Sequence, residues 1–244
     1  MANERLRAAM LQQGMTPDHL AQLVEVDAKT VERWIGGRVP YRRHRYAVAT
    51  HLKADETYLW PRALSAAQLA DAAESEIITV YPHRWTVPRD VWGQFLASAE
   101  EHISILVYSG LFLADDPGLV AMLQTKARDG VEIRILLGDP DSAEVFERSR
   151  SEGIEDALAS KIRNAISLYK PLRGVDGIEI RLHRTPLYNS IYRSDDELLV
   201  NTHVYGAGAA QAPVMHLRRV AGGDLVTTYL DSYERVWALA QPLD

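Results

Sequence analysis

The sequence of 244 residues contains no cysteine. It therefore forms no disulfide bonds and offers no thiol chemistry, which fits a cytoplasmic protein. No apolar run approaches the roughly 18 residues that a membrane-spanning helix needs. The first residues, MANERLRAAM, also lack the apolar core of a signal peptide. We therefore expect a cytoplasmic protein with no membrane partner.

Metal-binding and nucleotide-binding patterns are missing as well. The eight histidines show neither His-x-x-x-His spacing nor a carboxylate-bearing cluster, so we expect no structural metal and no cofactor. The segment 206–210 contains two glycines after an expected strand, but it lacks the third glycine of a dinucleotide fingerprint and a helix to open. This segment is interpreted as a flexible loop.

The charge is divided unevenly along a chain whose composition, 47% hydrophobic and 25% charged, is typical of a soluble globular protein. Residues 1–62 carry ten Lys and Arg against seven Asp and Glu, a net of +3. Residues 63–244 carry seventeen against twenty-six, a net of -9, which gives -6 in total. The basic part can approach phosphates that the acidic part would repel. This argues against a nonspecific nuclease in the acidic part.

The segment TPDHLAQLVEVDAKTVERWIGG, residues 16–37, predicts two short helices joined by a tight turn. Thr16 and Asp27 are the expected N-cap residues, and the glycine pair at 36–37 ends the second helix. Val31 and Trp34 fall on one face of that helix and should be buried. The opposite face is then free to enter the major groove of DNA, although an ordinary helical hairpin packed on a larger domain has the same spacing.

This segment resembles the helix-turn-helix of the lambda-repressor-like, or xenobiotic-response-element (XRE), regulators. The shared pattern is a threonine or serine, Leu-Ala, a valine before the turn, Thr-Val-x-x-Trp and a glycine shortly after, within about the first sixty residues. The family's Glu-x-Gly after the tryptophan is Ile35-Gly36-Gly37 here. The resemblance implies an all-α domain of five helices at residues 1–62 that binds DNA. The residues expected to contact DNA are Thr16, Ala28, Lys29, Thr30, Glu32, Arg33, Arg38, Arg42, Arg43 and Arg45.

The rest of this domain is expected to be helical around a basic segment. Helices are predicted at 3–13, 46–52 and 55–60. The four arginines of the segment 38–45, RVPYRRHR, would lie beside the DNA backbone and hold phosphates, unless they only form a solvated surface. Residues 63–76 are alanine-rich and predict a connecting helix between two domains.

From residue 77 on, strands alternate with helices and a hairpin follows. Strands are expected at 77–81, 103–109, 131–137, 178–183, 188–194, 197–205 and 215–219. Helices are expected at 88–101, 117–129, 142–171 and 223–240. This order predicts a second domain, residues 77–244, of the α/β class with a mixed sheet.

The order of these elements and the segment IEIRLHRTPLYNSIYRSDDELLVNTHVYG, residues 178–206, resemble the phospholipase D superfamily over roughly residues 77–240. That family's motif is His-x-Lys-x(4)-Asp, then six residues and Gly-Ser-x-Asn. The spacing survives, but Tyr188 takes the place of the nucleophilic histidine and Ser190 that of the phosphate-binding lysine, while Asp195 is kept. A tyrosine with a pKa near 10 is a poor nucleophile. The resemblance implies a phospholipase D-like fold, and the replaced residues predict a pseudoenzyme without catalytic residues.

Polar residues follow the expected parallel strands at their carboxyl ends, where α/β sheets bind ligands. Alternation along the strands 188–194 and 197–205 adds further side chains to the same place. Aromatic walls with a few polar groups suit a small, partly apolar molecule. The residues expected to line this ligand pocket are Tyr108, Ser109, Asp139, Tyr188, Ser190, Tyr192, Asp195, His203 and Tyr205.

These observations favour a homodimeric transcription regulator that binds a double-stranded DNA operator. Its C-terminal domain would dimerise and sense a small-molecule effector. One alternative is a DNA-targeted phosphodiesterase or nuclease with a rebuilt active site, which would have to use Tyr188, Ser190, Asp195 and His203. Another alternative makes the C-terminal domain a dimerisation scaffold without a ligand pocket.

Overall fold

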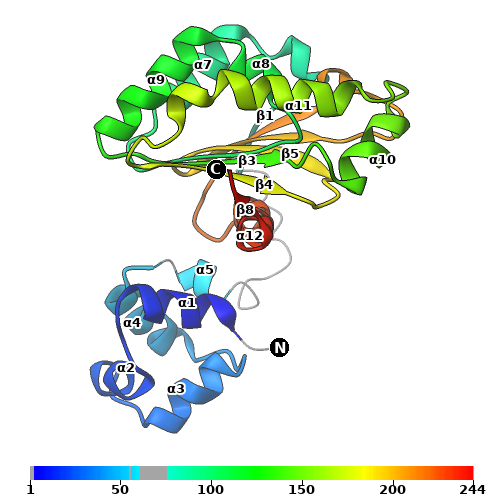
Figure 1. Cartoon of the computed structure of the whole chain (residues 1–244). Helices are drawn as coiled ribbons and strands as arrows, with labels where there is room; N and C mark the ends of the chain where they lie inside the picture. Colours follow the sequence, from blue (N-terminus) through cyan, green and yellow to red (C-terminus); the bar gives the residue numbers. More distant parts are fainter. Residues whose placement is uncertain (1–2, 55, 61–75, 244) are drawn as a thin grey trace. The chain divides into compact units, whose positions relative to one another are not determined.

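The computed structural model describes residues 3–54, 56–60 and 76–243 (Figure 1). The chain divides into two compact units, one formed by residues 1–76 with 219–227 and the other by residues 77–218 with 228–244. The predicted connecting helix, 63–76, lies outside the described residues except for its last position.

The N-terminal unit contains five helices among its described residues, as the sequence predicts. They are α1 (Glu4–Gln12), α2 (Pro17–Leu23), α3 (Ala28–Ile35), α4 (Arg42–Leu52) and α5 (Glu56–Leu59). One apolar cluster joins them, and it includes the predicted core residues Val31 and Trp34. Its buried members are Leu6, Ala9, Met10, Leu20, Ala21, Val24, Val31, Trp34, Val48, Ala49, Leu52, Leu59 and Trp60.

Side-chain caps set the starts of two of these helices. The amide oxygen of Asn3 accepts from the N–H of Leu6, and its amide nitrogen donates to the carbonyl of Leu59 over 2.8 Å. The hydroxyl of Thr16 accepts from the N–H of His19, as the sequence predicts. Asp27 is the N-cap residue of α3, as the sequence predicts, although its side chain makes no capping hydrogen bond.

The α/β unit is built on one mixed sheet of eight strands, in the order β1-β7-β6-β5-β2-β3-β4-β8. Strands β2, β3 and β4 are parallel, and all the other pairs are antiparallel. The strands are β1 (Ile77–Tyr81), β2 (His102–Leu106), β3 (Glu132–Gly138), β4 (Ile178–His183), β5 (Asn189–Ser194), β6 (Glu197–Thr202), β7 (Val214–Arg218) and β8 (Gln241–Pro242). The fold class, helical followed by α/β with a mixed sheet, is thereby confirmed.

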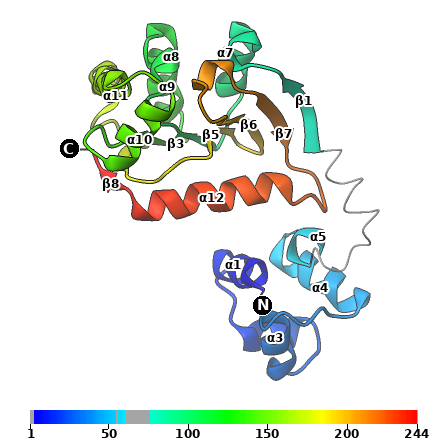
Figure 2. The same cartoon turned by 90° about the vertical axis from the view of Figure 1, so that its right-hand side faces the viewer.

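Helices cover the sheet from both sides (Figures 1 and 2). Helices α7 (Arg89–Ala97), α8 (Leu111–Ala114), α9 (Pro117–Arg128) and α11 (Ala157–Leu168) lie on one face, and α10 (Ala143–Ser151) lies at one end of the sheet, after β3. Helix α12 (Leu225–Leu239) lies on the other, where the Tyr233 hydroxyl donates to the carbonyl of Arg134 and the Arg181 guanidinium stacks on Trp237. Short 3-10 turns are η2 (Arg84–Thr86), η3 (Lys170–Leu172) and η4 (Ala209–Gln211).

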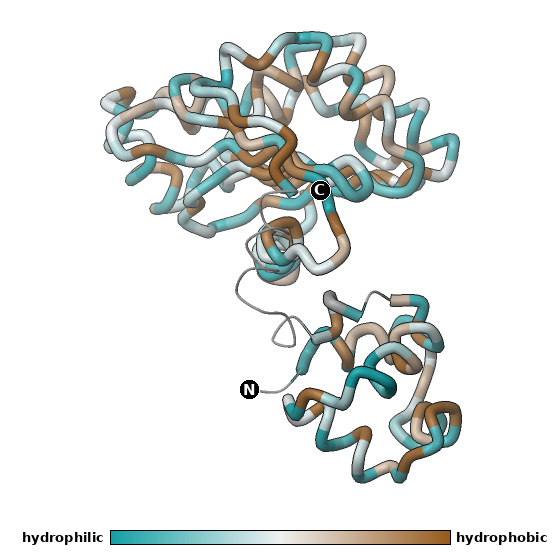
Figure 3. Tube along the Cα trace, turned by 180° about the vertical axis from the view of Figure 1, so that it is seen from behind, coloured by the Kyte–Doolittle hydropathy of each residue, from teal (hydrophilic) through white to brown (hydrophobic). Residues whose placement is uncertain are grey.

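The apolar residues gather inside the α/β unit, where brown segments run along the central strands (Figure 3). Ile103, Ile105, Ile133 and Ile135 of β2 and β3 are completely buried, as expected of strands covered on both faces. Within the described residues, no helix has the length and apolar character needed to cross a membrane.

Several expected boundaries differ from the structure. The expected strand 103–109 ends at Leu106, and the expected helix 88–101 ends at Ala97. The expected helix 142–171 is two helices, because Gly153 and Glu155 between them have positive φ of 67° and 46°. The expected strand 197–205 ends at Thr202. The fourth helix begins at Arg42 rather than at residue 46, so part of the basic segment is helical.

Candidate nucleic-acid interface and ligand pocket

Helix α3 presents a polar face that no other part of the described chain covers. Val31 and Trp34 are buried on its inner face, whereas Lys29, Glu32 and Arg33 are exposed. These three charged side chains have no ion-pair or hydrogen-bond partner among the described residues. Thr30 is half-buried beside them. The face can therefore meet a partner without first breaking an internal contact.

A tight turn fixes α3 against α2. Glu25 adopts a positive φ of 54°, and the N–H of Val26 donates to the carbonyl of Ala21 over 3.0 Å. Ala21 and Val24 are buried at this corner. Of the other two residues predicted to contact DNA here, Thr16 is exposed and Ala28 half-buried.

The basic segment forms the first turn of α4 instead of an extended arm. Arg42 and Arg43 are exposed there, and the turn contains no acidic residue. Cations at the positive end of a helix dipole are unfavourable, and the unpaired N–H groups of the same turn attract anions. A phosphate bound at this turn would relieve both effects.

The other two arginines of the segment behave differently. Arg38 is exposed and has no partner among the described residues. Arg45 donates to the Glu56 carboxylate over 2.8 Å and to the carbonyl of Pro40 over 3.0 Å, with 16% of its side chain exposed. Arg45 thus has internal partners before any phosphate is bound, unlike Arg38.

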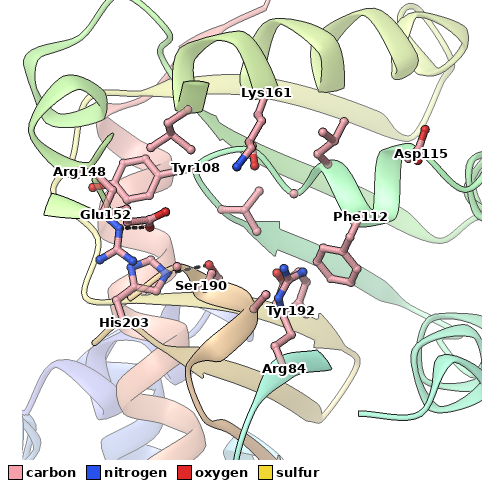
Figure 4. A pocket seen from close by; sticks show the side chains of 18 residues that line it. Arg84, Tyr108, Phe112, Asp115, Arg148, Glu152, Lys161, Ser190, Tyr192 and His203 are labelled. Carbon is pink, nitrogen blue, oxygen red and sulfur yellow. Dashed lines mark hydrogen bonds and ion pairs between the residues drawn. The ribbon is translucent and has the colours of Figure 1, made fainter. Parts of the chain in front are cut away.

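The α/β unit contains a pocket of about 380 Å³ (Figure 4). It lies beyond the carboxyl end of β2, as expected for a sheet of this class. Its walls combine apolar side chains with hydroxyl, imidazole and charged groups. The lining residues that the sequence predicts are Tyr108, Ser109, Ser190, Tyr192 and His203.

The other predicted pocket residues lie elsewhere. Tyr188 and Tyr205 are 82% and 91% exposed, because Tyr188 precedes β5 and Tyr205 follows the shortened β6. Asp139 pairs with Arg184 over 2.8 Å and accepts from the N–H of Asp141. These three expected placements are wrong, since strand alternation does not extend beyond the strand ends.

Asp195, the acidic residue kept from the phospholipase D motif spacing, holds a turn together instead of lining the pocket. It lies in the turn after β5, at the end of the strand away from Ser190, with a positive φ of 49°. Its carboxylate accepts from the N–H groups of Glu100, Glu101 and His102 at 2.7 to 2.9 Å. Burial alone would raise the pKa of Asp195, but these hydrogen bonds hold the pKa below its usual value. The pocket is formed without it.

Ser190 and His203 form a pair inside the pocket. The His203 Nδ1 lies 3.1 Å from the carbonyl of Leu187 and must donate to it, so the Ser190 hydroxyl donates to Nε2, also over 3.1 Å. Burial, together with the charge of Arg148, lowers the pKa of His203 to about 4. The imidazole is therefore neutral near pH 7 and a weak base, which makes it a poor activator of the serine.

Five charged residues of the pocket escape sequence reasoning. Arg84 comes from the turn η2, and Asp115 directly follows α8. Arg148 lies in α10, Glu152 directly follows it, and Lys161 lies in α11. Arg148 and Glu152 pair over 2.6 Å. No motif marks these residues, and only the tertiary fold brings them to one place. No cluster of three or more potential metal ligands occurs within the described part of the chain.

Comparison with known proteins finds solved structures that are similar to this chain, but no match to its sequence. No protein-family model matches the sequence, and no curated protein matches it. The chain is similar to Nuc, a phospholipase D family member from Salmonella typhimurium, with 16% identity over 64% of this chain and 90% of Nuc and a TM-score of 0.39. It is also similar to TrmBL2, an archaeal chromatin protein whose structure shows a novel mode of DNA binding. That match has 17% identity over 99% of this chain and 93% of TrmBL2, with a TM-score of 0.42.

Proposed function

We propose that the protein is a cytoplasmic, homodimeric transcription regulator that recognises a DNA operator with its N-terminal unit and binds a small-molecule effector in its α/β unit. The observation that carries this proposal is the outer face of α3. Its charged side chains are exposed and have no partner among the described residues, while the inner face anchors the helix in the core. A helix that reads the major groove needs these two properties together.

The proposed roles follow from position. Lys29 and Arg33 read base edges, and Thr30 and Glu32 support them. Arg38, Arg42 and Arg43 hold phosphates, which adds affinity without sequence information. The net charge of +3 on residues 1–62 favours approach to DNA by this unit rather than by the acidic remainder.

Dimerisation follows from the small size of the reading surface. One helix-turn-helix buries little area, whereas two bind half-sites one helical turn apart, about 34 Å, with much higher combined affinity. We therefore expect a two-fold symmetric operator.

The pocket supports the effector role and disfavours a pure scaffold, because its walls are polar as well as apolar and side chains do not fill it. An effector can change DNA affinity only if it binds the DNA-competent and incompetent forms of the dimer unequally. Occupation of the pocket would thus act by shifting the balance between these forms.

Footprinting on genomic fragments tests the proposal. The protein should protect a region with two related half-sites, and candidate metabolites or cell extract should release it. If the folded protein at micromolar concentration protects no region at all, the proposal fails.

The Ser190–His203 hydrogen bond favours one second candidate, a DNA-targeted phosphodiesterase. The low pKa of His203 counts against it. Hydrolysis of bis(4-nitrophenyl) phosphate by the wild type, lost in Ser190→Ala, would support this candidate. Equal background rates for both proteins would dismiss it.

A further inference from the structure

The unpaired cations of the pocket indicate the chemical class of its ligand. We infer that the pocket binds a small organic carboxylate with an apolar or aromatic body, held mainly by Arg84 and also by Lys161. This inference rests on the proposed effector pocket and names what that pocket recognises.

Arg84 is a half-buried cation without an acceptor. Its guanidinium stacks on the ring of Phe112 at 3.9 Å, and its Nε is fully buried with no hydrogen-bond partner. Its backbone N–H donates to the carbonyl of Ala212, but the other N–H groups of the guanidinium have no partner among the described residues. Buried donors of this kind cost free energy unless something accepts from them. Arg84 points into the pocket, so a ligand acceptor there can pair with the terminal N–H groups of the guanidinium, for which the described residues supply no acceptor (Figure 4).

Lys161 offers a second free cation. It extends from α11 into the same pocket and has no partner within the described part of the chain (Figure 4). Arg148 is different, because its Nε donates to Glu152 and its Nη2 to the carbonyl of Ala207. Arg84 and Lys161 are therefore the two cations of the pocket that remain available to bind an anionic ligand.

The net charge of the side chains that line the pocket favours a ligand with one negative charge. Arg84, Arg148 and Lys161 contribute three positive charges, and Asp115 and Glu152 contribute two negative charges, which leaves +1. The imidazole of His203 is neutral near pH 7. One negative charge on the ligand brings the pocket to neutrality.

The shape of the anchor favours a carboxylate. Phe112 covers one face of the Arg84 guanidinium, so the planar edge is the part left for a ligand, and a carboxylate fits that edge with two parallel hydrogen bonds. Apolar side chains line the remaining space, and they include Val107, Leu111 and Leu158. They suit an apolar body attached to the anion.

A matched ligand panel tests the inference on the full-length protein without DNA. The probes are a set of aryl and alkyl carboxylates, their primary amides and the monoanion methyl phenyl phosphate, with binding followed by ligand-observed NMR and calorimetry. Carboxylates should bind at least tenfold more tightly than their amides. Arg84→Gln should remove that preference, and Lys161→Gln should weaken carboxylate binding several-fold.

Arg163→Gln is the control, because this exposed arginine of α11 pairs with Asp141 and lies outside the pocket. It should bind like the wild type. Lys161 is exposed, so its variant tests the inference even if Arg84→Gln does not fold.

The inference is overturned if no carboxylate binds, if amides bind equally well, or if the phosphodiester alone binds. If one of these results is obtained while a small molecule still releases the protein from DNA, only the proposed carboxylate class is refuted. Carboxylate binding with no effect on DNA would instead refute the proposed regulation.

Discussion

At the scale of single residues, the buried His183 and the half-buried His203 give the α/β unit a specific response to acid. Burial lowers the pKa of both His183 and His203 to about 4, whereas an unfolded histidine titrates near 6.5. Between roughly pH 4 and pH 6.5 the unfolded chain therefore binds more protons than the folded chain. The free energy of unfolding falls as pH falls through this window, by up to about 1.4 kcal/mol per pH unit for each histidine.

We predict that the double variant His183→Gln/His203→Gln loses less stability than the wild type between pH 7 and pH 5. Urea denaturation at the two pH values measures the difference. His19→Gln, which replaces an exposed histidine, is the control and should behave like the wild type. An equal loss in the double variant and the wild type would show that these histidines do not cause the response.

Arg33 carries the second prediction at this scale. Arg33→Ala should weaken operator binding by about 1–3 kcal/mol and relax specificity at one base pair. Arg7→Ala, which removes the same charge from an exposed position of α1 paired with Glu4, should have little effect. Competition binding with single-base operator variants makes the comparison. Equal losses for the two variants would mean that only charge matters.

Helical periodicity is what makes the reading face predictable. The spacing of Val31 and Trp34 determines which side of α3 is buried, and Lys29 and Arg33 follow from it. The pocket is only half predictable by the same means. Ser190 lies in β5 and His203 directly follows β6, but Arg84 and Lys161 come from distant elements that only the tertiary fold brings together.

At the scale of elements, the basic first turn of α4 should lower the stability of the free protein and raise its affinity for DNA. Arg42 opposes the helix dipole, so Arg42→Ala should stabilise the free protein by about 0.3–1 kcal/mol. The same change should weaken binding to all DNA sequences and lower the salt dependence by about one phosphate contact.

Arg45→Ala is the matched comparison. It removes the ion pair with Glu56, so it should lower stability and leave the salt dependence unchanged. Salt titrations and denaturation of both variants give the result. If the DNA affinity of Arg45→Ala depends less steeply on salt concentration than that of Arg42→Ala, then Arg45 and not Arg42 makes the phosphate contact.

The turn after β5 supplies a second prediction at this scale. Asp195→Ala should lower the free energy of unfolding by about 2–4 kcal/mol, because three N–H groups lose their acceptor and alanine disfavours a positive φ. Asp195→Asn should cost less, since asparagine keeps an acceptor oxygen and tolerates that conformation. Both variants should keep the pocket's ligand affinity. Loss of binding by folded Asp195→Asn would contradict a structural role.

Element types were easier to predict than element boundaries. Apolar runs and alternation indicate the strands of the α/β unit, and Thr16 as an N-cap indicates α2. The early start of α4 was not predictable, because four basic residues in and around a first turn oppose the helix dipole. The break between α10 and α11 depends on a positive φ at Glu155, a residue that rarely adopts it.

At the scale of the whole molecule, we predict a homodimer both free and on DNA. Sedimentation or light scattering should give twice the chain mass of 27.3 kDa at micromolar concentration. Two protomers should occupy one operator with half-sites one helical turn, about 34 Å, apart. A monomeric mass under both conditions would exclude the symmetric arrangement.

Selection of DNA from a random duplex pool tests the central claim most directly. The wild type and the variant Lys29→Ala/Arg33→Ala should be compared at the same salt concentration. The wild type should enrich a two-fold symmetric motif. The variant should lose this enrichment yet keep salt-dependent, nonspecific affinity through Arg38, Arg42 and Arg43. Enrichment of the same motif by the variant, or of no motif by the wild type, would contradict sequence reading by α3.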